Sequence, residues 1–169
     1  NELLQGDPGN KTLLALKKDA NEGELGIKIN DTLLDFQDEE ALSDTEIQKE
    51  ELLSKIANSL SLYGYNEMTK GIQDLKAVIE EDLFIQRFDS LESSFINNSL
   101  PAEELFEKSQ KLLNQYPGQR DVINLSEQIK QKRSIELLDI LKNQAAIFTS
   151  EEKWEDASKT YSDIYLITN

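Results

Sequence analysis

Apolar residues recur at alternating steps of three and four along most of this chain. That spacing places them on one face of an α-helix, because a helix turns once every 3.6 residues. The last stretch is the clearest example, and its face consists of Trp154, Ala157, Tyr161, Ile164 and Thr168. Only 3 prolines and 7 glycines are available to break helices. The pattern predicts an all-α protein.

Long and short helices alternate in this prediction. Each long helix is followed by a shorter one, and the expected pairs are residues 10–36 with 43–63, 72–95 with 101–116, and 117–148 with 149–169. The segments 43–46 and 149–152 have the spacing of a capping box, in which a hydroxyl and a carboxylate satisfy free backbone amides. We therefore expect the first and the last short helix to begin there.

The short helices also align with one another at a spacing of about 52 residues, which puts Leu53, Leu105 and Ala157 at one shared position. A second internal similarity relates residues 7–16 to residues 116–125, because both segments contain Pro-Gly followed by polar residues and then by aliphatic ones. An internal repeat of this length indicates a stacked helical array. We predict a single domain over residues 1–169, with repeats at 8–64, 65–116 and 117–169 and extra acidic residues at 38–44.

Each long helix changes the phase of its apolar stripe near its middle. The steps from Ala20 to Leu25, from Ile79 to Phe84, and from Ile129 to Ile135 all exceed four residues. A continuous helix with such a change turns its two halves toward different neighbours. We expect the first half to pack on the preceding helix pair and the second half on its own short helix. The alternative is a break into two helices, for which Gly23 and Gly26 are the best positions.

The last helix pair resembles the tetratricopeptide repeat. Small and large residues alternate across the pair at Leu141, Ala145, Phe148, Trp154, Ala157, Tyr161, Ile164 and Asn169, and the second half of the pattern recurs at Leu105, Ser109, Leu112 and Pro117. The repeat is about 52 residues long rather than about 34, and Gln144-Ala145 stands where the family has Leu-Gly. The resemblance implies a right-handed array of antiparallel helix hairpins that binds other proteins.

Composition restricts the function. The net charge is −15, so phosphate backbones and anionic lipid are repelled, and a basic protein partner is favoured over nucleic acid. No apolar run is long enough for membrane insertion. The chain has no His and no Cys, which excludes thiol catalysis, Ser-His-Asp chemistry and structural zinc. The same composition fits the cytoplasm and the periplasm equally well.

The remaining candidates for chemistry are acidic or aromatic. Paired carboxylates such as Glu103-Glu104 lie at expected helix starts, where acids are favoured electrostatically, and we interpret them as solvated surface. The acidic run at 38–44 lacks the ligand spacing of a calcium loop. We therefore predict no catalytic residue, cofactor or metal site. We also interpret Trp154, Tyr161 and Tyr165 as core residues.

Two weak candidates for partner binding lie in the third long helix. Lys130, Lys132 and Arg133 form a basic cluster that either pairs with the acidic surface or contacts an acidic tail of a partner. Lys142 and Asn143 come from the resemblance, because some tetratricopeptide proteins hold a terminal carboxylate with Lys and Asn on first helices. No other repeat supplies a matching pair.

These observations predict a non-enzymatic protein–protein interaction or scaffolding module of a larger protein. The alternative is a regulatory domain that senses a ligand or peptide within a larger protein, such as a bacterial extracytoplasmic or kinase-linked one. A polar-lined cavity would favour that alternative. Because residues 164–167 form a poor cap, we also expect an uncapped array end that continues in a longer chain or supports a homodimer.

Overall fold

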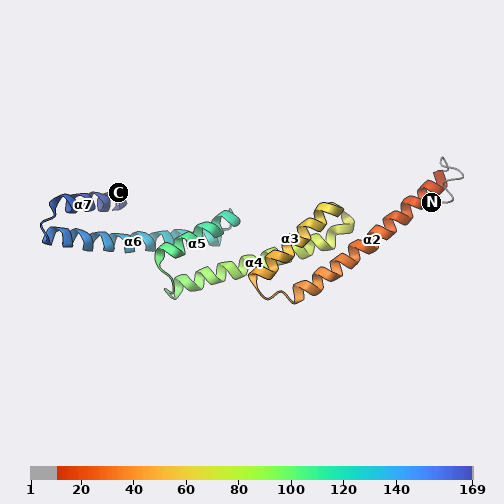
Figure 1. Ribbon diagram of the computed structural model, residues 1–169, viewed down its shortest axis with the longest axis horizontal. Helices are drawn as coiled ribbons and strands as arrows, with labels where there is room; N and C mark the ends of the chain where they lie inside the picture. The colour runs from red at the N-terminus through yellow and green to blue at the C-terminus, as the bar shows by residue number, and fades with distance from the viewer. Residues whose placement is uncertain (1–10, 169) are drawn as a thin grey trace. The chain divides into compact units, whose positions relative to one another are not determined.

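The apolar stripes correspond to helices in the computed structural model, which describes residues 11–168. Six α-helices and one short 3-10 helix occupy this range: α2 (Lys11–Ala41), α3 (Glu46–Tyr63), η1 (Glu67–Thr69), α4 (Lys70–Ile96), α5 (Ala102–Gln115), α6 (Arg120–Ser150) and α7 (Trp154–Thr168) (Figure 1). The described residues form an all-α protein whose helices pack mainly against their neighbours in sequence. Predictions for residues 1–10 and 169 lie outside the described residues.

The chain separates into two compact units, and the boundary falls inside α4 between Leu83 and Phe84. The first half of α4 therefore belongs to one unit and its second half to the other. Each unit has a hydrophobic core of its own. The predicted three-repeat organisation of a single domain stays a prediction.

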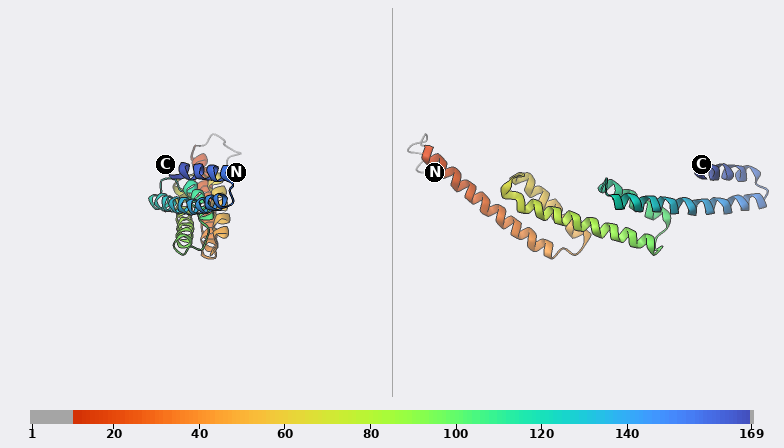
Figure 2. Two further views of the ribbon diagram at one scale, coloured as in Figure 1. Left: turned by 90° about the vertical axis from the view of Figure 1, so that its left-hand side faces the viewer. Right: turned by 180° about the vertical axis from the view of Figure 1, so that it is seen from behind.

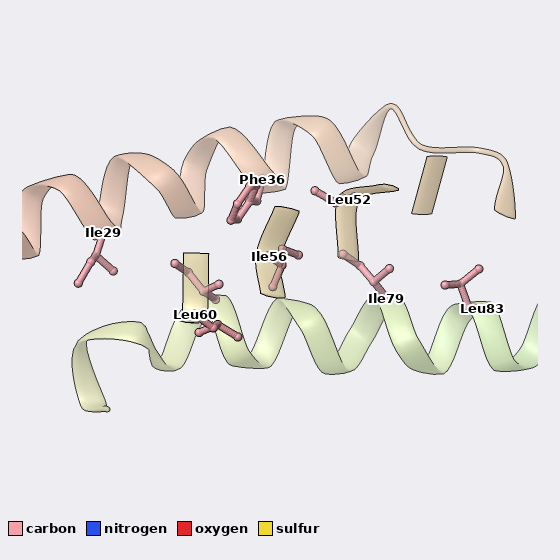
Figure 3. Packing of buried hydrophobic residues seen from close by; sticks show 8 residues of the cluster. Ile29, Phe36, Leu52, Ile56, Leu60, Ile79 and Leu83 are labelled. Carbon is pink, nitrogen blue, oxygen red and sulfur yellow. The ribbon is translucent and has the colours of Figure 1, made fainter. Parts of the chain in front are cut away.

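The first unit is built from the second half of α2, from α3 and from the first half of α4. Its buried apolar residues are aliphatic with the exception of one phenylalanine: Ile29, Phe36, Leu52, Ile56, Leu60, Ile72, Ile79 and Leu83. Figure 3 shows side chains of α2 and α4 directed toward each other, with those of α3 among them. This arrangement removes Leu52 and Ile56 completely from solvent. Burying one such side chain contributes about 1.5–3 kcal/mol.

The second unit repeats this plan with the second half of α4, with α5 and with the first half of α6. Its buried apolar residues are Leu91, Leu105, Leu112, Val122, Leu125 and Ile129. Phenylalanines from α4 surround them, and the ring of Phe84 meets Tyr116 edge-on at 4.9 Å between centroids. Ser109 is also buried, and its hydroxyl donates to the Phe106 carbonyl at 2.8 Å.

The second half of α6 and α7 form a further helix pair in the second unit. Figures 1 and 2 show α7 antiparallel beside α6. Among the side chains of this pair whose burial is described, only Ala145, Ala157 and Thr160 are buried, so the pair buries fewer residues than either of the two cores.

The phase changes within the long helices have the predicted consequence. Helices α2, α4 and α6 are unbroken, and the alternative break at Gly23 and Gly26 does not occur. In α4 and α6 the first half packs with the preceding helix pair, as the two cores show. The second half of α6 packs with its own short helix α7. The prediction is therefore confirmed for these helices.

The spacing of three and four predicted that α3 buries Leu53, Ala57 and Leu60, and of these Leu60 is buried. The other two were wrong by one residue, because Leu52 and Ile56 are buried, whereas Leu53 is only partly buried and Ala57 is exposed. Both series have helical spacing, and packing against two neighbouring helices selected the one with larger side chains. The buried positions of α3 and α5 are consequently related by a spacing of 53 rather than 52 at Leu52 and Leu105.

Both predicted capping boxes were also misplaced. The cap of α3 is Thr45, whose hydroxyl accepts from the Gln48 amide, while the Gln48 side chain accepts from the Thr45 amide. Ser43 instead donates to the Glu39 carbonyl at 2.8 Å. At the other end, Thr149 lies within α6 and its hydroxyl donates to the Ala145 carbonyl. Helix α6 therefore ends at Ser150, inside the segment that was expected to start α7, and α7 begins only at Trp154.

The connection between α3 and α4 depends on two residues with special backbone roles. Gly64 has a φ of 80°, a conformation that favours glycine. The side chain of Asn66 then accepts from the amides of Met68 and Thr69 and so begins η1. This turn leads the chain directly into α4.

Candidate functional site

The predicted basic cluster is mostly engaged in holding the second unit together. The Lys132 ammonium donates to Asn98 Oδ1 at 2.6 Å and lies 5.7 Å from the centre of the Phe95 ring. The Arg133 guanidinium donates to the Glu103 carboxylate and stacks over the Phe106 ring at 4.5 Å. These contacts tie α6 to α5 and to the end of α4. The pairing expected as one alternative therefore occurs at Lys132 and Arg133.

The other three candidates do not gather into one patch. Lys130, Lys142 and Asn143 are exposed on α6. Lys142 lies about 18 Å further along the helix than Lys130, because each residue advances a helix by about 1.5 Å. A role for these residues in partner binding stays a prediction.

A groove lies on α7. It has a volume of about 650 Å³ and is lined by Thr149, Trp154, Ala157, Ser158, Tyr161, Ser162, Tyr165 and Leu166. We call it the α7 groove. Three aromatic side chains line it with large exposed fractions, which are 64% for Trp154, 54% for Tyr161 and 66% for Tyr165.

The interpretation of these aromatic residues as core was wrong. Helical spacing predicts a face but not the neighbour that covers it. In α5 the corresponding face is buried because α4 and α6 both contribute to its core. In the described chain α7 packs with α6 alone, so its large residues remain in solvent. The sequence signal for the groove was the gathering of one Trp and two Tyr on a single short helix.

Aromatic side chains in a groove suit a protein surface as ligand. Trp and Tyr combine a large apolar area with a polar atom, and they dominate the binding energy of many interfaces. Acidic residues flank them in the first turn of α7, at Glu155 and Asp156. The α7 groove therefore offers apolar contact area with a negatively charged border.

A second hollow lies within the second unit, between the end of α4 and the start of α6. It has a volume of about 480 Å³ and is lined by Phe88, Glu92, Phe95, Ile96, Asp121, Asn124, Leu125 and Gln128. A neighbouring hollow of similar volume shares Phe95 and Gln128 with it. Carboxylates, amides and phenyl rings thus converge on one small space, which we call the α4–α6 hollow.

The surface electrostatics indicate ion pairing. The Glu151 carboxylate accepts from Lys153 at 2.7 Å, and this hydrogen bond raises the pKa of the lysine. Among residues 11–168 no group of three His, Cys, Asp or Glu side chains is arranged to hold a metal ion. None of the helices in this range has both the length and the apolar character of a membrane span.

Comparison with protein-family models, with curated proteins and with solved structures found no match to this chain.

Proposed function

We propose that this chain is a non-enzymatic protein–protein interaction and scaffolding module built from tetratricopeptide-like helix pairs. The observation that carries the proposal is the α7 groove, in which Trp154, Tyr161 and Tyr165 are exposed beside one another. A single exposed apolar residue is ordinary, whereas several large aromatic residues around one groove are typical of a binding surface.

The repeated plan of the two cores supports an array. In each core, the end of one long helix, a short helix and the start of the next long helix bury one set of apolar side chains. Such units stack by repeating the same contact, as helical repeat proteins do. A right-handed superhelical arrangement of the units is part of the proposal.

The chemistry of the surface favours binding over catalysis. The chain lacks His and Cys, and carboxylate pairs such as Glu50-Glu51 and Glu103-Glu104 are exposed on helices. Catalytic acids and bases usually occupy dry clefts in which a neighbour shifts their pKa values. The pKa shift found near the α7 groove, at Lys153, keeps a surface lysine charged and creates no acid or base for neutral pH.

A retention experiment tests the proposal. We expect immobilised chain to retain a protein from a lysate of its source, because the groove supplies aromatic anchors. Trp154→Ser should abolish retention, and the matched control Leu62→Ser should not, since Leu62 is 76% exposed on α3 outside the groove. If the unchanged chain, Trp154→Ser and Leu62→Ser retained the partner equally, the α7 groove would not be the binding surface.

The α4–α6 hollow favours a second candidate function, which is the sensing of a small polar ligand or peptide. Its lining combines Asp121, Asn124 and Gln128 with the Phe95 ring, so hydrogen-bonding groups and an apolar surface face one space. A ligand bound there should raise the melting temperature. Asn124→Ala should remove that increase, whereas Asn143→Ala, an exposed amide elsewhere on α6, should leave it unchanged.

A further inference from the structure

The α4–α6 hollow is formed by one face of each of its two helices. Its polar and aromatic residues recur at helical steps of three and four: Phe88, Glu92 and Phe95 on α4, and Asp121, Asn124 and Gln128 on α6. Side chains at such steps lie on the same side of a helix. All of these residues belong to the second unit, and they are far in sequence from residues 1–10 and 169. The hollow is therefore a surface of the second unit itself.

Two carboxylates in the hollow have no cationic partner among residues 11–168. Neither Glu92 nor Asp121 forms an ion pair or a side-chain hydrogen bond in this range, and no lysine or arginine lines the hollow. Glu92 is partly buried, so water solvates its charge incompletely. The hollow concentrates negative potential in a chain whose net charge is already −15, and such a potential attracts cationic groups.

The second unit already holds one arginine with a carboxylate and a phenyl ring. The Arg133 guanidinium donates to the Glu103 carboxylate and lies over the Phe106 ring at 4.5 Å. The α4–α6 hollow offers the same two kinds of group, the Glu92 carboxylate and the Phe88 ring, which lie one helical turn apart on α4. The side chains of this hollow therefore match a set with which the chain pairs an arginine of its own.

The chemistry of the lining fits a guanidinium better than a metal ion. A guanidinium is planar and has five N–H donors, so it can bond to carboxylates and amide oxygens while it stacks on a ring. Glu92 and Asp121 supply the carboxylates, and Asn124 and Gln128 supply the amide oxygens. Hard metal ions need about six oxygen ligands, and among residues 11–168 no group of three acidic side chains is arranged to hold one.

The hollow continues into its neighbour, which makes the whole surface longer than one side chain. The two hollows share Phe95 and Gln128, and from Asp121 to Ile135 the surface follows α6 for about 21 Å. Ile96 lines one hollow and is 66% exposed, and Ile135 lines the other and is 61% exposed. These apolar contacts favour a peptide segment over a free cation.

We propose that the α4–α6 hollow binds an arginine side chain of a partner protein, and that apolar residues next to this arginine contact Ile96 and Ile135. The guanidinium donates to the Glu92 and Asp121 carboxylates and lies against the Phe88 ring. The proposal rests on the second candidate function given above, and it names the chemical class of the ligand.

A pair of peptides tests the charge of the ligand. The probe is the acetylated and amidated pentapeptide Ala-Leu-Arg-Leu-Ala, and its control has citrulline in place of arginine, because citrulline keeps the shape of the side chain without its charge. In NMR titrations of the whole chain, the arginine peptide should shift the side-chain amide signals of Asn124 and Gln128 with a Kd of about 1 mM or lower. The citrulline peptide should bind about tenfold more weakly, because charge-assisted hydrogen bonds are lost.

Three variants test the site. Glu92→Gln and Asp121→Asn each remove one charge with little change of shape, and each should weaken binding of the arginine peptide about tenfold. The matched control Glu127→Gln removes the same charge from an exposed position of α6 outside both hollows, and it should bind like the unchanged chain. Circular dichroism checks that all three variants remain helical. Added salt should weaken binding to the unchanged chain.

The inference is overturned if the arginine peptide shifts neither amide signal at concentrations up to about 10 mM. It is equally overturned if both peptides bind alike, or if Glu92→Gln binds like Glu127→Gln.

The outcomes also separate this inference from the functions proposed above. Binding of the arginine peptide that is lost in Trp154→Ser but kept in Glu92→Gln would assign basic segments to the α7 groove, which keeps the interaction module and rejects this inference. Equal binding of both peptides that is lost in Asn124→Ala would keep the α4–α6 hollow as a ligand site and reject only the requirement for a cation.

Discussion

The two cores share one architecture but fill it with different side chains. In the first core the short helix α3 contributes large aliphatic residues such as Leu52 and Ile56. Lys49 and Ile56 are buried on α3. At the equivalent positions of the short helix α5, the buried residues are the smaller Ala102 and Ser109. Phenylalanines of α4, including Phe84 and Phe88, supply apolar volume around it.

This difference shows that the repeated feature is the arrangement of helices, whereas the residue type at a given position varies. A core needs a total volume and an apolar character, and different residues meet both requirements. Polar atoms are satisfied locally in each case. Lys49 of the first core bonds to Asp82 at 2.5 Å, and Ser126 of the second accepts from Gln110 at 3.2 Å. No buried side-chain nitrogen or oxygen among the described residues lacks a partner.

The largest effect is expected at Ile56, which is fully buried on the aliphatic short helix. Ile56→Ala should lower the free energy of unfolding by about 2–5 kcal/mol, because it removes apolar contacts and leaves a cavity. Denaturant titration measures the change. Leu62→Ala on the exposed face of the same helix should stay within about 0.5 kcal/mol. Equal effects of the two substitutions would contradict the assigned face of α3.

The second core should respond in the opposite direction to side-chain size. Ser109→Ile introduces the residue of the first core into the tighter site and should destabilise by about 1–3 kcal/mol through overpacking. Ser109→Ala removes the hydrogen bond to the Phe106 carbonyl and the longer one to the Ser126 hydroxyl without adding volume, and it should change stability by about 1 kcal/mol. Thermal or denaturant unfolding ranks the pair. If isoleucine were tolerated better than alanine, the packing of α5 against α6 would be looser than described.

The polar contact of the first core is asymmetric, since Lys49 is buried and the Asp82 side chain is 52% exposed. Asp82→Ala leaves a buried ammonium without its carboxylate and should cost about 1–3 kcal/mol. Lys49→Met leaves a carboxylate that water can solvate and should change stability by about 1 kcal/mol or less. Denaturant titration of both variants should give the lower unfolding midpoint for Asp82→Ala. The opposite order would show that the burial of Lys49 does not determine the cost of breaking this contact.

The α6–α7 pair extends the comparison to a face of α7 that no other helix among residues 11–168 covers. Trp154→Ala should reduce stability by less than about 1 kcal/mol, because the side chain is 64% exposed. A Trp buried in either core would cost about 3–5 kcal/mol on the same substitution. Chemical denaturation of the single variant is sufficient, and a loss of 3 kcal/mol or more would show that a further element covers α7.

The smallest effect lies on the exposed half of α2, before the first core begins. The side chain of Lys28 donates to the Glu24 carboxylate at 2.8 Å, which lowers the pKa of Glu24 below its ordinary value of 4.5. A lowered pKa means that the contribution of the pair to stability is present above about pH 4.5 and is lost as the pH falls through the lowered value. NMR titration should show the pKa returning toward 4.5 in Lys28→Met and unchanged in Lys11→Met.

The sequence by itself determined where the helices form and which half of α4 and of α6 packs against which neighbour. Spacings of three and four predicted the all-α architecture. The phase changes near Ile79 and Ile129 predicted that the first half of α4 and of α6 packs against the preceding helix pair. These predictions succeeded because helical periodicity is a local property of each helix that buries one face. The basic cluster and the aromatic residues of α7 were visible in the sequence as well, but their roles were not.

Only the tertiary structure decided which of two helically spaced series is buried, and what covers it. Leu52 rather than Leu53 lies in the first core because two neighbouring helices meet on that side of α3. Arg133 lies against Phe106 and Glu103 instead of facing solvent because α5 approaches α6 there. Trp154 is exposed because α7 has one helical neighbour among the described residues. Burial depends on the number of neighbours in space, which the spacing of residues along one helix does not contain.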